Sequence, residues 1–344
     1  MDHEKKGGGV VEPLYIDDFI TVARAASDEC KRNVEIMHES CEETGLPEEP
    51  EKNEGPATTI GFLGLELDSE TMEIRLPQDK LARTRGMLAS WRGRKACRKR
   101  ELLSLIGVLS HAAKAVRAGR SFLRRMIDLS CSVKHLEQFV RMNKEARADI
   151  EWWYQYVETW NGTAMMFAVR GSQPPASVTS DASGNWGCGA YSGSEWFMLQ
   201  WVGPIQSLHI TVKELAPIVV AAILWGRSWG GKVIHVQCDN SAVVSIVNQG
   251  SSRNSQAMQL TRCLAFLAAK WEFHIIASHI KGVDNILADA LSRDNLPLFR
   301  TLYPQASPVP AVIPEAVLDL LFLREPEWTS RNWTEQWNSI FATA

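Results

Sequence analysis

Four acidic residues in the second half of the chain have the types and spacing that phosphodiester chemistry would use. Asp181 lies in an alternating apolar stretch, and Asp239 ends the expected strand KVIHVQCD. Glu214 opens an expected helix, and Asp289 lies on the last expected helix of the segment. Hydrolysis by two metal ions about 3.5–4 Å apart requires clustered hard oxygen ligands. The four carboxylates therefore predict a divalent-metal site.

Each of these residues also has an ordinary structural explanation. Thr211 and Glu214 match a capping box, although a helix capped at Thr211 would need the N–H that Pro217 lacks. Asp181 could be a turn residue before Gly184.

The same holds for the other two carboxylates. Asp239 could cap the helix that follows it, and Asp289 could pair with Arg293 one helical turn later. Taken singly, such structural uses are the commoner explanation. All four in one segment favour the metal site.

The elements expected between residues 177 and 298 would position these carboxylates. Two short strands flank Gly184 and Asn185, and a third is expected near 195–202. The remaining elements alternate: helices at 214–226, 241–249, 254–270 and 285–293, and strands at 232–239 and 273–279. This order predicts a mixed α/β sheet, with Asp239 at the carboxyl end of a strand, where sites form in such sheets.

The first half of the chain has a different pattern. Residues 14–76 read as α+β pieces, with a helix around 34–41 and a strand pair in TIGFLGLELD. Residues 79–160 are expected to be helical, with an apolar stripe from 102 to 113 and a further helix over 136–160.

Composition limits the class of protein. At 344 residues, the chain suggests roughly two or three domains. Its longest apolar run, 215–225, is shorter than the about 20 residues that cross a bilayer, and no apolar leader follows Met1. Seven cysteines without a C-x-x-C pair argue against a disulfide framework and a zinc site. We therefore expect an intracellular chain without a membrane partner, in the cytoplasm or the nucleus.

Charge is divided unevenly along the chain. Residues 1–78 contain 19 acidic and 7 basic residues, whereas residues 79–125 contain 14 basic and 2 acidic residues. The basic segment is either a solvated helical face or a surface that lies along a polyanion. On the second interpretation, nucleic-acid phosphates would contact Lys95, Arg98, Lys99 and Arg100.

Four stretches resemble, in order, the ribonuclease H domain of retroelement polyproteins: TSDASGNWGCGAY, TVKELAPIVVAAILW, VQCDNSAVV and SHIKGVDNILADALSR. The resemblance implies a ribonuclease H-like mixed five-stranded sheet with flanking helices, and two Mg²⁺ (or Mn²⁺) ions. His279 holds the place of that family's mobile histidine, and Asn240 is added to the expected nucleic-acid contacts. The implied catalytic carboxylates and metal ligands are Asp181, Glu214, Asp239 and Asp289.

Upstream, the motif YIDDF resembles the polymerase turn of reverse transcriptases, with Asp17 and Asp18 as its aspartates. The stretch from 50 to 68 resembles the later palm motifs and the primer grip. The stretches EIRLPQDKL, LLSLIGVLSHAAKAV and DIEWWYQYVETWNG are most similar to sequences of DIRS-type, tyrosine-recombinase retroelements. Only fourteen residues precede Tyr15, so we expect a late fragment without the first catalytic aspartate and without polymerase activity of its own.

These observations predict four regions: a late part of a reverse-transcriptase palm (1–76), a helical thumb and connection (77–170), a ribonuclease H-like domain (175–298) and a Pro- and Trp-containing tail (299–344). The expected activity is metal-dependent endonucleolytic hydrolysis of the RNA strand of RNA/DNA hybrids. Two alternatives stay open. One is an RNA-directed DNA polymerase completed by an upstream polyprotein segment or a partner chain, and the other is an inactive nucleic-acid-binding relic.

Overall fold

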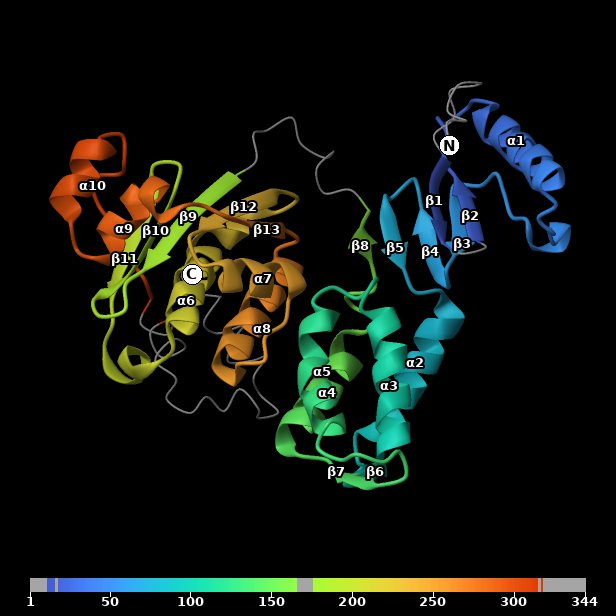
Figure 1. The fold of residues 1–344 in the computed structure, drawn as a ribbon, viewed down its shortest axis with the longest axis horizontal. Helices are drawn as coiled ribbons and strands as arrows, with labels where there is room; N and C mark the ends of the chain where they lie inside the picture. The colour runs from blue at the N-terminus through green and yellow to red at the C-terminus, as the bar shows by residue number, and fades with distance from the viewer. Residues whose placement is uncertain (1–10, 16–17, 166–175, 315–316, 318–344) are drawn as a thin grey trace. The chain divides into compact units, whose positions relative to one another are not determined.

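The computed structural model describes residues 11–15, 18–165, 176–314 and 317; the remaining residues are grey in Figure 1. The chain divides into two compact units after Gln78. Among the described residues, no helix has the length and apolar character needed to cross a membrane. Asp17 of the YIDD motif lies outside the described residues.

The first unit contains antiparallel strands and one long helix. β1 (Val11–Tyr15) pairs with β2 (Asp18–Thr21), and α1 (Glu29–Thr44) follows. The helix ends at Gly45, whose φ of 71° is the left-handed conformation that favours glycine. A 3₁₀ turn, η1 (Pro50–Lys52), precedes β3 (Thr59–Phe62), β4 (Leu65–Asp68) and β5 (Glu73–Arg75), which pair antiparallel in this order. The strand pair predicted in TIGFLGLELD is confirmed.

The second unit begins with a helical region. Its helices are α2 (Gln78–Trp91), α3 (Lys99–Ala112), α4 (Arg124–Ser130) and α5 (Lys144–Tyr156), with a 3₁₀ turn η2 (Gly119–Phe122) and a short strand β8 (Thr163–Ala164). The predicted apolar stripe of α3 is buried at Leu102, Leu105 and Leu109. The ring of Trp152 stacks on Phe122 with centroids 3.8 Å apart. These large side chains give the region its core.

The prediction of a helix over 136–160 is wrong for its first residues. Instead, β7 (Phe139–Arg141) pairs antiparallel with β6 (Ala96–Arg98), and Phe139 is 67% exposed. α5 begins only after Asn143, whose side chain accepts a hydrogen bond from the N–H of Ala146. The pairing partner of β7, the strand β6, lies about forty residues earlier in the sequence. A local periodicity therefore does not indicate this pairing.

A five-stranded mixed sheet forms the rest of the unit, in the order β11-β10-β9-β12-β13. β9, β10 and β11 are antiparallel neighbours, and β12 is parallel to both β9 and β13. This arrangement confirms the predicted fold class, a mixed five-stranded sheet with flanking helices. The strands are β9 (Ala176–Ala182), β10 (Gly187–Ser192), β11 (Glu195–Gln200), β12 (Val233–Cys238) and β13 (His274–His279).

Helices cover both faces of this sheet (Figure 1). Phe197 of β11 contacts Trp225 of α6 (Ile210–Trp225), whereas its neighbour Trp196 packs in a cluster with Leu291 and Phe299 from α9 (Ile286–Ser292) and α10 (Leu296–Leu302). Because successive strand residues point to opposite faces, α6 covers one face and α9 with α10 the other. The remaining helices are α7 (Ser241–Gln249), beside β12 and β13, and α8 (Ser255–Lys270), which packs on α6.

The first residue of α6 differs from the prediction. The helix begins at Ile210 and is capped by His209, whose Nδ1 accepts a hydrogen bond from the N–H of Thr211. Glu214 therefore lies in the second turn, and the capping-box explanation of Glu214 is wrong. Pro217 lies inside the helix, where burial of nearly the whole helix offsets the missing backbone bond.

The chain after α10 continues along the edge strand β11. The N–H of Ser307 donates to Ser194 O at 2.7 Å, and the N–H of Ala311 donates to Trp196 O at 2.8 Å. The indole Nε1 of Trp196 donates to Ser307 O. The predicted boundary at residue 298 thus falls inside α10, and residues up to 311 cover an edge that would otherwise be open.

Candidate metal centre

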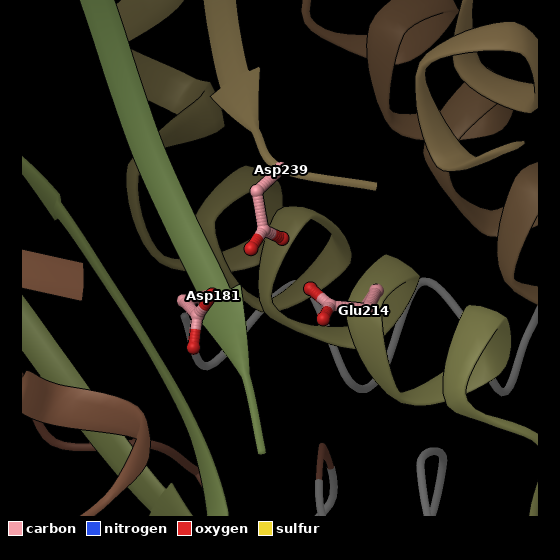
Figure 2. Close-up of side chains that lie close together, drawn as sticks. All are labelled: Asp181, Glu214 and Asp239. Atoms are coloured by element: carbon pink, nitrogen blue, oxygen red, sulfur yellow. The ribbon is translucent and has the colours of Figure 1, made fainter. Parts of the chain in front are cut away.

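Three of the four predicted carboxylates converge on one point. Asp181 lies near the end of β9, Glu214 lies in α6, and Asp239 directly follows β12. Each offers one oxygen, and these oxygens all lie within 4.8 Å of one another. Figure 2 shows the three side chains pointing toward a common region from their separate elements. Residues up to 58 positions apart are thus brought into one group by the parallel β9–β12 pair and the helix packed beneath it.

Burial gives this group unusual electrostatics. Asp181 and Glu214 are only 4% and 5% exposed. Burial, together with the charge of neighbouring carboxylates, raises the pKa of Asp181 to about 6 and that of Glu214 to about 9. The hydrogen bond from Ser292 acts in the opposite direction on Asp181.

The donor set fits a hard divalent cation. All three groups offer carboxylate oxygens, the ligands that Mg²⁺ and Mn²⁺ prefer. The Oε2 atom of Glu214 is buried and has no hydrogen-bond partner among the described residues. A buried, unpaired carboxylate oxygen is costly, and a cation beside it removes that cost.

The fourth carboxylate, Asp289, lies outside this group. It is on α9, and its Oδ1 accepts a hydrogen bond from Nε of Arg293 at 2.6 Å, one turn later. Its charge is near enough to raise the pKa of Asp181. This ion pair is the ordinary structural role for Asp289 that the sequence suggested.

His279 ends β13, next to β12 in the sheet, and is exposed. Its Nε2 lies 3.1 Å from the carbonyl oxygen of Asp239. Because a carbonyl can only accept, this nitrogen donates and carries the proton. The imidazole therefore lies beside the backbone of Asp239, at the exposed end of β13.

Two residues that the sequence analysis did not single out contact Asp181 directly. Asn285 precedes α9 and Ser292 is its last residue, and each donates a hydrogen bond to one oxygen of the Asp181 carboxylate. Because Asn285 and Ser292 are seven residues apart, which is two helical turns, the sequence pattern could have indicated that both lie on the helix face toward the site. Asp289, four residues after Asn285 and three before Ser292, belongs to the same helical face.

The predicted nucleic-acid contacts have protein partners in most cases. Glu137 pairs with both Arg98 and Arg100, at 2.9 and 3.0 Å. Nζ of Lys99 donates to the carbonyl of Val133 at 2.8 Å. Lys95 is exposed.

The two other predicted site residues have separate positions. Asn240 is the N-cap of α7, with its Oδ1 accepting from the N–H groups of Ala242 and Val243. Asp18 begins β2 in the first unit and is exposed.

No family model matches this chain, and no curated protein matches it. Among solved structures, it is similar to a foamy viral protease-reverse transcriptase in complex with double-stranded DNA (15% identity, TM-score 0.39), covering 78% of this chain and 46% of the other. A foamy viral protease-reverse transcriptase in complex with RNA/DNA hybrid is similar with 12% identity and a TM-score of 0.38. This match covers 77% of this chain and 35% of the other.

A third similar structure is RNase H1 from the halophilic archaeon Halobacterium salinarum. It has 14% identity and a TM-score of 0.28, and the match covers 36% of this chain and 98% of that one. The chain spans less than half the length of the two foamy viral proteins above.

Proposed function

We propose that this chain is a metal-dependent ribonuclease that cuts the RNA strand of RNA/DNA hybrids, within a fragment of a reverse transcriptase. The observation that carries the proposal is the convergence of Asp181, Glu214 and Asp239 from three separate elements. The order of the ribonuclease H-like sequence motifs supports it, because each of these carboxylates belongs to a different motif.

Asp181, Glu214 and Asp239 are the residues that would hold Mg²⁺ or Mn²⁺. A pair of such ions would activate a water molecule and stabilise the charge on the leaving oxygen of the phosphodiester. The chain contributes a fixed geometry, because two of the carboxylates are buried on a strand and a helix. Asp239 is only partly buried, so the scissile phosphate would approach from its side.

We assign Asp289 as a fourth ligand that becomes available when its ion pair opens. The side chains of Asp289 and Arg293 are 43% and 63% exposed, and an exposed pair of this kind contributes at most about 1 kcal/mol. Binding of a divalent ion nearby would outweigh so weak a contact. Arg293 would then be free to face the substrate phosphates.

His279 is proposed to assist proton transfer or product release. It lies beside Asp239 at the exposed end of β13 and makes its hydrogen bond to a backbone carbonyl, not to a carboxylate.

Recognition of the hybrid would combine two features. The 2′-hydroxyls would distinguish the RNA strand, and basic residues of the helical region, Lys95 in particular, would contact phosphates. An origin in DIRS-type retroelements is proposed from the similarity of the sequence motifs alone.

The proposal is tested with purified protein and end-labelled 20-base-pair duplexes of four kinds: RNA/DNA hybrid, double-stranded RNA, double-stranded DNA, and hybrid with 2′-O-methyl RNA. We expect internal cuts in the RNA of the first duplex only, with Mg²⁺ and not with EDTA. Cutting of double-stranded DNA at a similar rate would contradict the proposed substrate. Tight hybrid binding without any cutting would favour the nucleic-acid-binding relic.

A further inference from the structure

We infer that Ser292 and Asn285 are positioning residues that hold the Asp181 carboxylate in the orientation needed to bind metal. The inference rests on the proposed function, since it concerns the same carboxylate group. Neither residue is placed among the ligands: both act through Asp181.

The contacts hold both oxygens of one carboxylate. Oγ of Ser292 donates to Oδ2 of Asp181 at 2.5 Å, and Nδ2 of Asn285 donates to Oδ1 at 3.3 Å. The same Nδ2 lies 3.2 Å from the carbonyl oxygen of Ser180, the residue before Asp181. Asn285 and Ser292 are 2% and 0% exposed, so water does not compete for these bonds.

The bonds leave room for metal. An ionised carboxylate has about four lone-pair positions, and the two donors occupy two of them. The terminal torsion of an aspartate is otherwise soft, so a free carboxylate would sample a broad range of orientations. Two donors, one just before α9 and one at its last residue, therefore fix the plane of the carboxylate and leave its other lone pairs for metal.

The end of α9 is itself held in place. The carbonyl of Ser292 accepts a hydrogen bond from Oγ of Ser183 at 2.8 Å, and that hydroxyl accepts from the N–H groups of Trp186 and Gly187. On the same face, a Cβ added at Gly189 would lie 2.4 Å from Cβ of Leu291, so the helix approaches β10 more closely than any other residue there would allow. The donors are thus attached to a rigid element.

The amide of Asn285 gives an independent indication of this role. Its Oδ1 is buried and has no hydrogen-bond partner among the described residues, which is unfavourable for folding. An apolar side chain of similar size would avoid that cost if the position served packing alone. What the amide provides is its N–H group, which faces Asp181.

The test measures Mn²⁺ binding directly, by loss of the free-Mn²⁺ EPR signal, on the full chain without nucleic acid. Binding that persists in Asp239→Asn is subtracted as background from other carboxylates. For Ser292→Ala and Asn285→Leu we expect affinity for Mn²⁺ to fall by about 10–100-fold, the usual effect of removing a residue that orients a metal ligand. Ser292→Thr, which keeps the hydroxyl, should restore most of the affinity.

The matched control is Ser130→Ala in α4. Ser130 is 3% exposed and its hydroxyl also makes a partly buried hydrogen bond, to the carbonyl of Ile127, but it does not contact the carboxylate group. It should lose a similar amount of thermal stability and keep its Mn²⁺ affinity. Mn²⁺ binding by Ser292→Ala and Asn285→Leu at the wild-type affinity would overturn the inference.

The outcome is independent of hybrid cleavage. If the wild-type chain binds Mn²⁺ and does not cut hybrids, the proposed function fails, yet weaker binding by Ser292→Ala still supports the positioning role. If the wild-type chain cuts hybrids and Ser292→Ala binds Mn²⁺ normally, the positioning role fails alone.

Discussion

The carboxylate of Asp149 lies 2.7 Å from the guanidinium of Arg262, and both side chains are almost completely buried. Asp149 belongs to α5 of the helical region, whereas Arg262 belongs to α8 beside the mixed sheet. Nε of Arg262 also donates to the carbonyl of Ser121, whose hydroxyl donates to the carbonyl of Gly250. These contacts explain why residues after Gln78 form one compact unit, where the sequence predicted a separate thumb and ribonuclease H-like domain.

Asp149→Asn should therefore destabilise the whole second unit. The change leaves Arg262 buried without its counter-charge, for which the expected loss in the free energy of unfolding is about 3–5 kcal/mol. Urea unfolding followed by tryptophan fluorescence measures this loss. The matched control is Asp128→Asn in the exposed pair with Arg124, which should cost less than about 1 kcal/mol. Equal losses in the two variants would show that the buried pair does not join the two regions.

Replacing Phe299 tests whether α10 is part of the domain that contains the mixed sheet. Its side chain is fully buried against Trp196, with ring centroids 5.1 Å apart. Phe299→Ala should cost about 3–5 kcal/mol in the free energy of unfolding, whereas Leu302→Ala, on the same helix and 49% exposed, should cost under about 1 kcal/mol. A small loss for Phe299→Ala would restore the boundary predicted at residue 298.

The raised pKa of Glu214 makes the stability of the metal-free protein depend on pH. Its folded-state pKa of about 9 exceeds its ordinary value of 4.5, so the folded state binds the proton more tightly. The stabilisation of the folded state by the proton on Glu214 is complete below pH 4.5 and is lost as the pH rises through 9. Protonated Asp181 also stabilises the folded state, and this contribution is lost as the pH rises through about 6. In EDTA at pH 8, Glu214→Gln should raise the melting temperature by at least about 2–4 °C, the shift that 1 kcal/mol produces at this size.

Two comparisons control that experiment. Glu195→Gln, at an exposed position on β11, should leave the melting temperature and its pH slope unchanged. Added Mg²⁺ should stabilise the wild-type protein and not Glu214→Gln, since a ligand of the folded state raises its stability. A wild-type melting temperature that rises between pH 6 and 9 in EDTA would contradict the assigned electrostatics.

Salt dependence tests the basic segment. Lys95→Ser should lower the slope of log affinity against log salt by about 0.9, because one phosphate is no longer neutralised, without changing which nucleic acid is bound. Glu137→Gln should have the opposite effect, because it releases Arg98 and Arg100 from their ion pairs. Hybrid binding measured by fluorescence anisotropy gives both slopes. Unchanged slopes would identify the segment as a solvated face.

The sequence predicted the mixed sheet because strand and helix periodicities are local, and it predicted the grouping of Asp181, Glu214 and Asp239 because each belongs to a separate motif. It did not predict β7, whose partner β6 is distant in the chain. The ion pair of Asp289 with Arg293 is local to one helical turn, and the sequence offered it. The hydrogen bonds of Asn285 and Ser292 to Asp181, by contrast, depend on tertiary packing. Such contacts follow from how α9 lies on β9, which no single segment specifies.

The most direct test of the account is hybrid cleavage by Asp239→Asn beside the wild-type chain and His279→Ala, in Mg²⁺. Asp239→Asn keeps the size of the side chain and removes a charge from the carboxylate group. We predict that the wild-type chain cuts the RNA strand and that His279→Ala cuts it about 10²-fold more slowly, the usual effect of losing proton-transfer assistance. Asp239→Asn should not cut it, while its melting temperature in EDTA is no lower than that of the wild type. Cleavage by Asp239→Asn at the wild-type rate would contradict the assignment of Asp181, Glu214 and Asp239 as the metal-binding site of a nuclease.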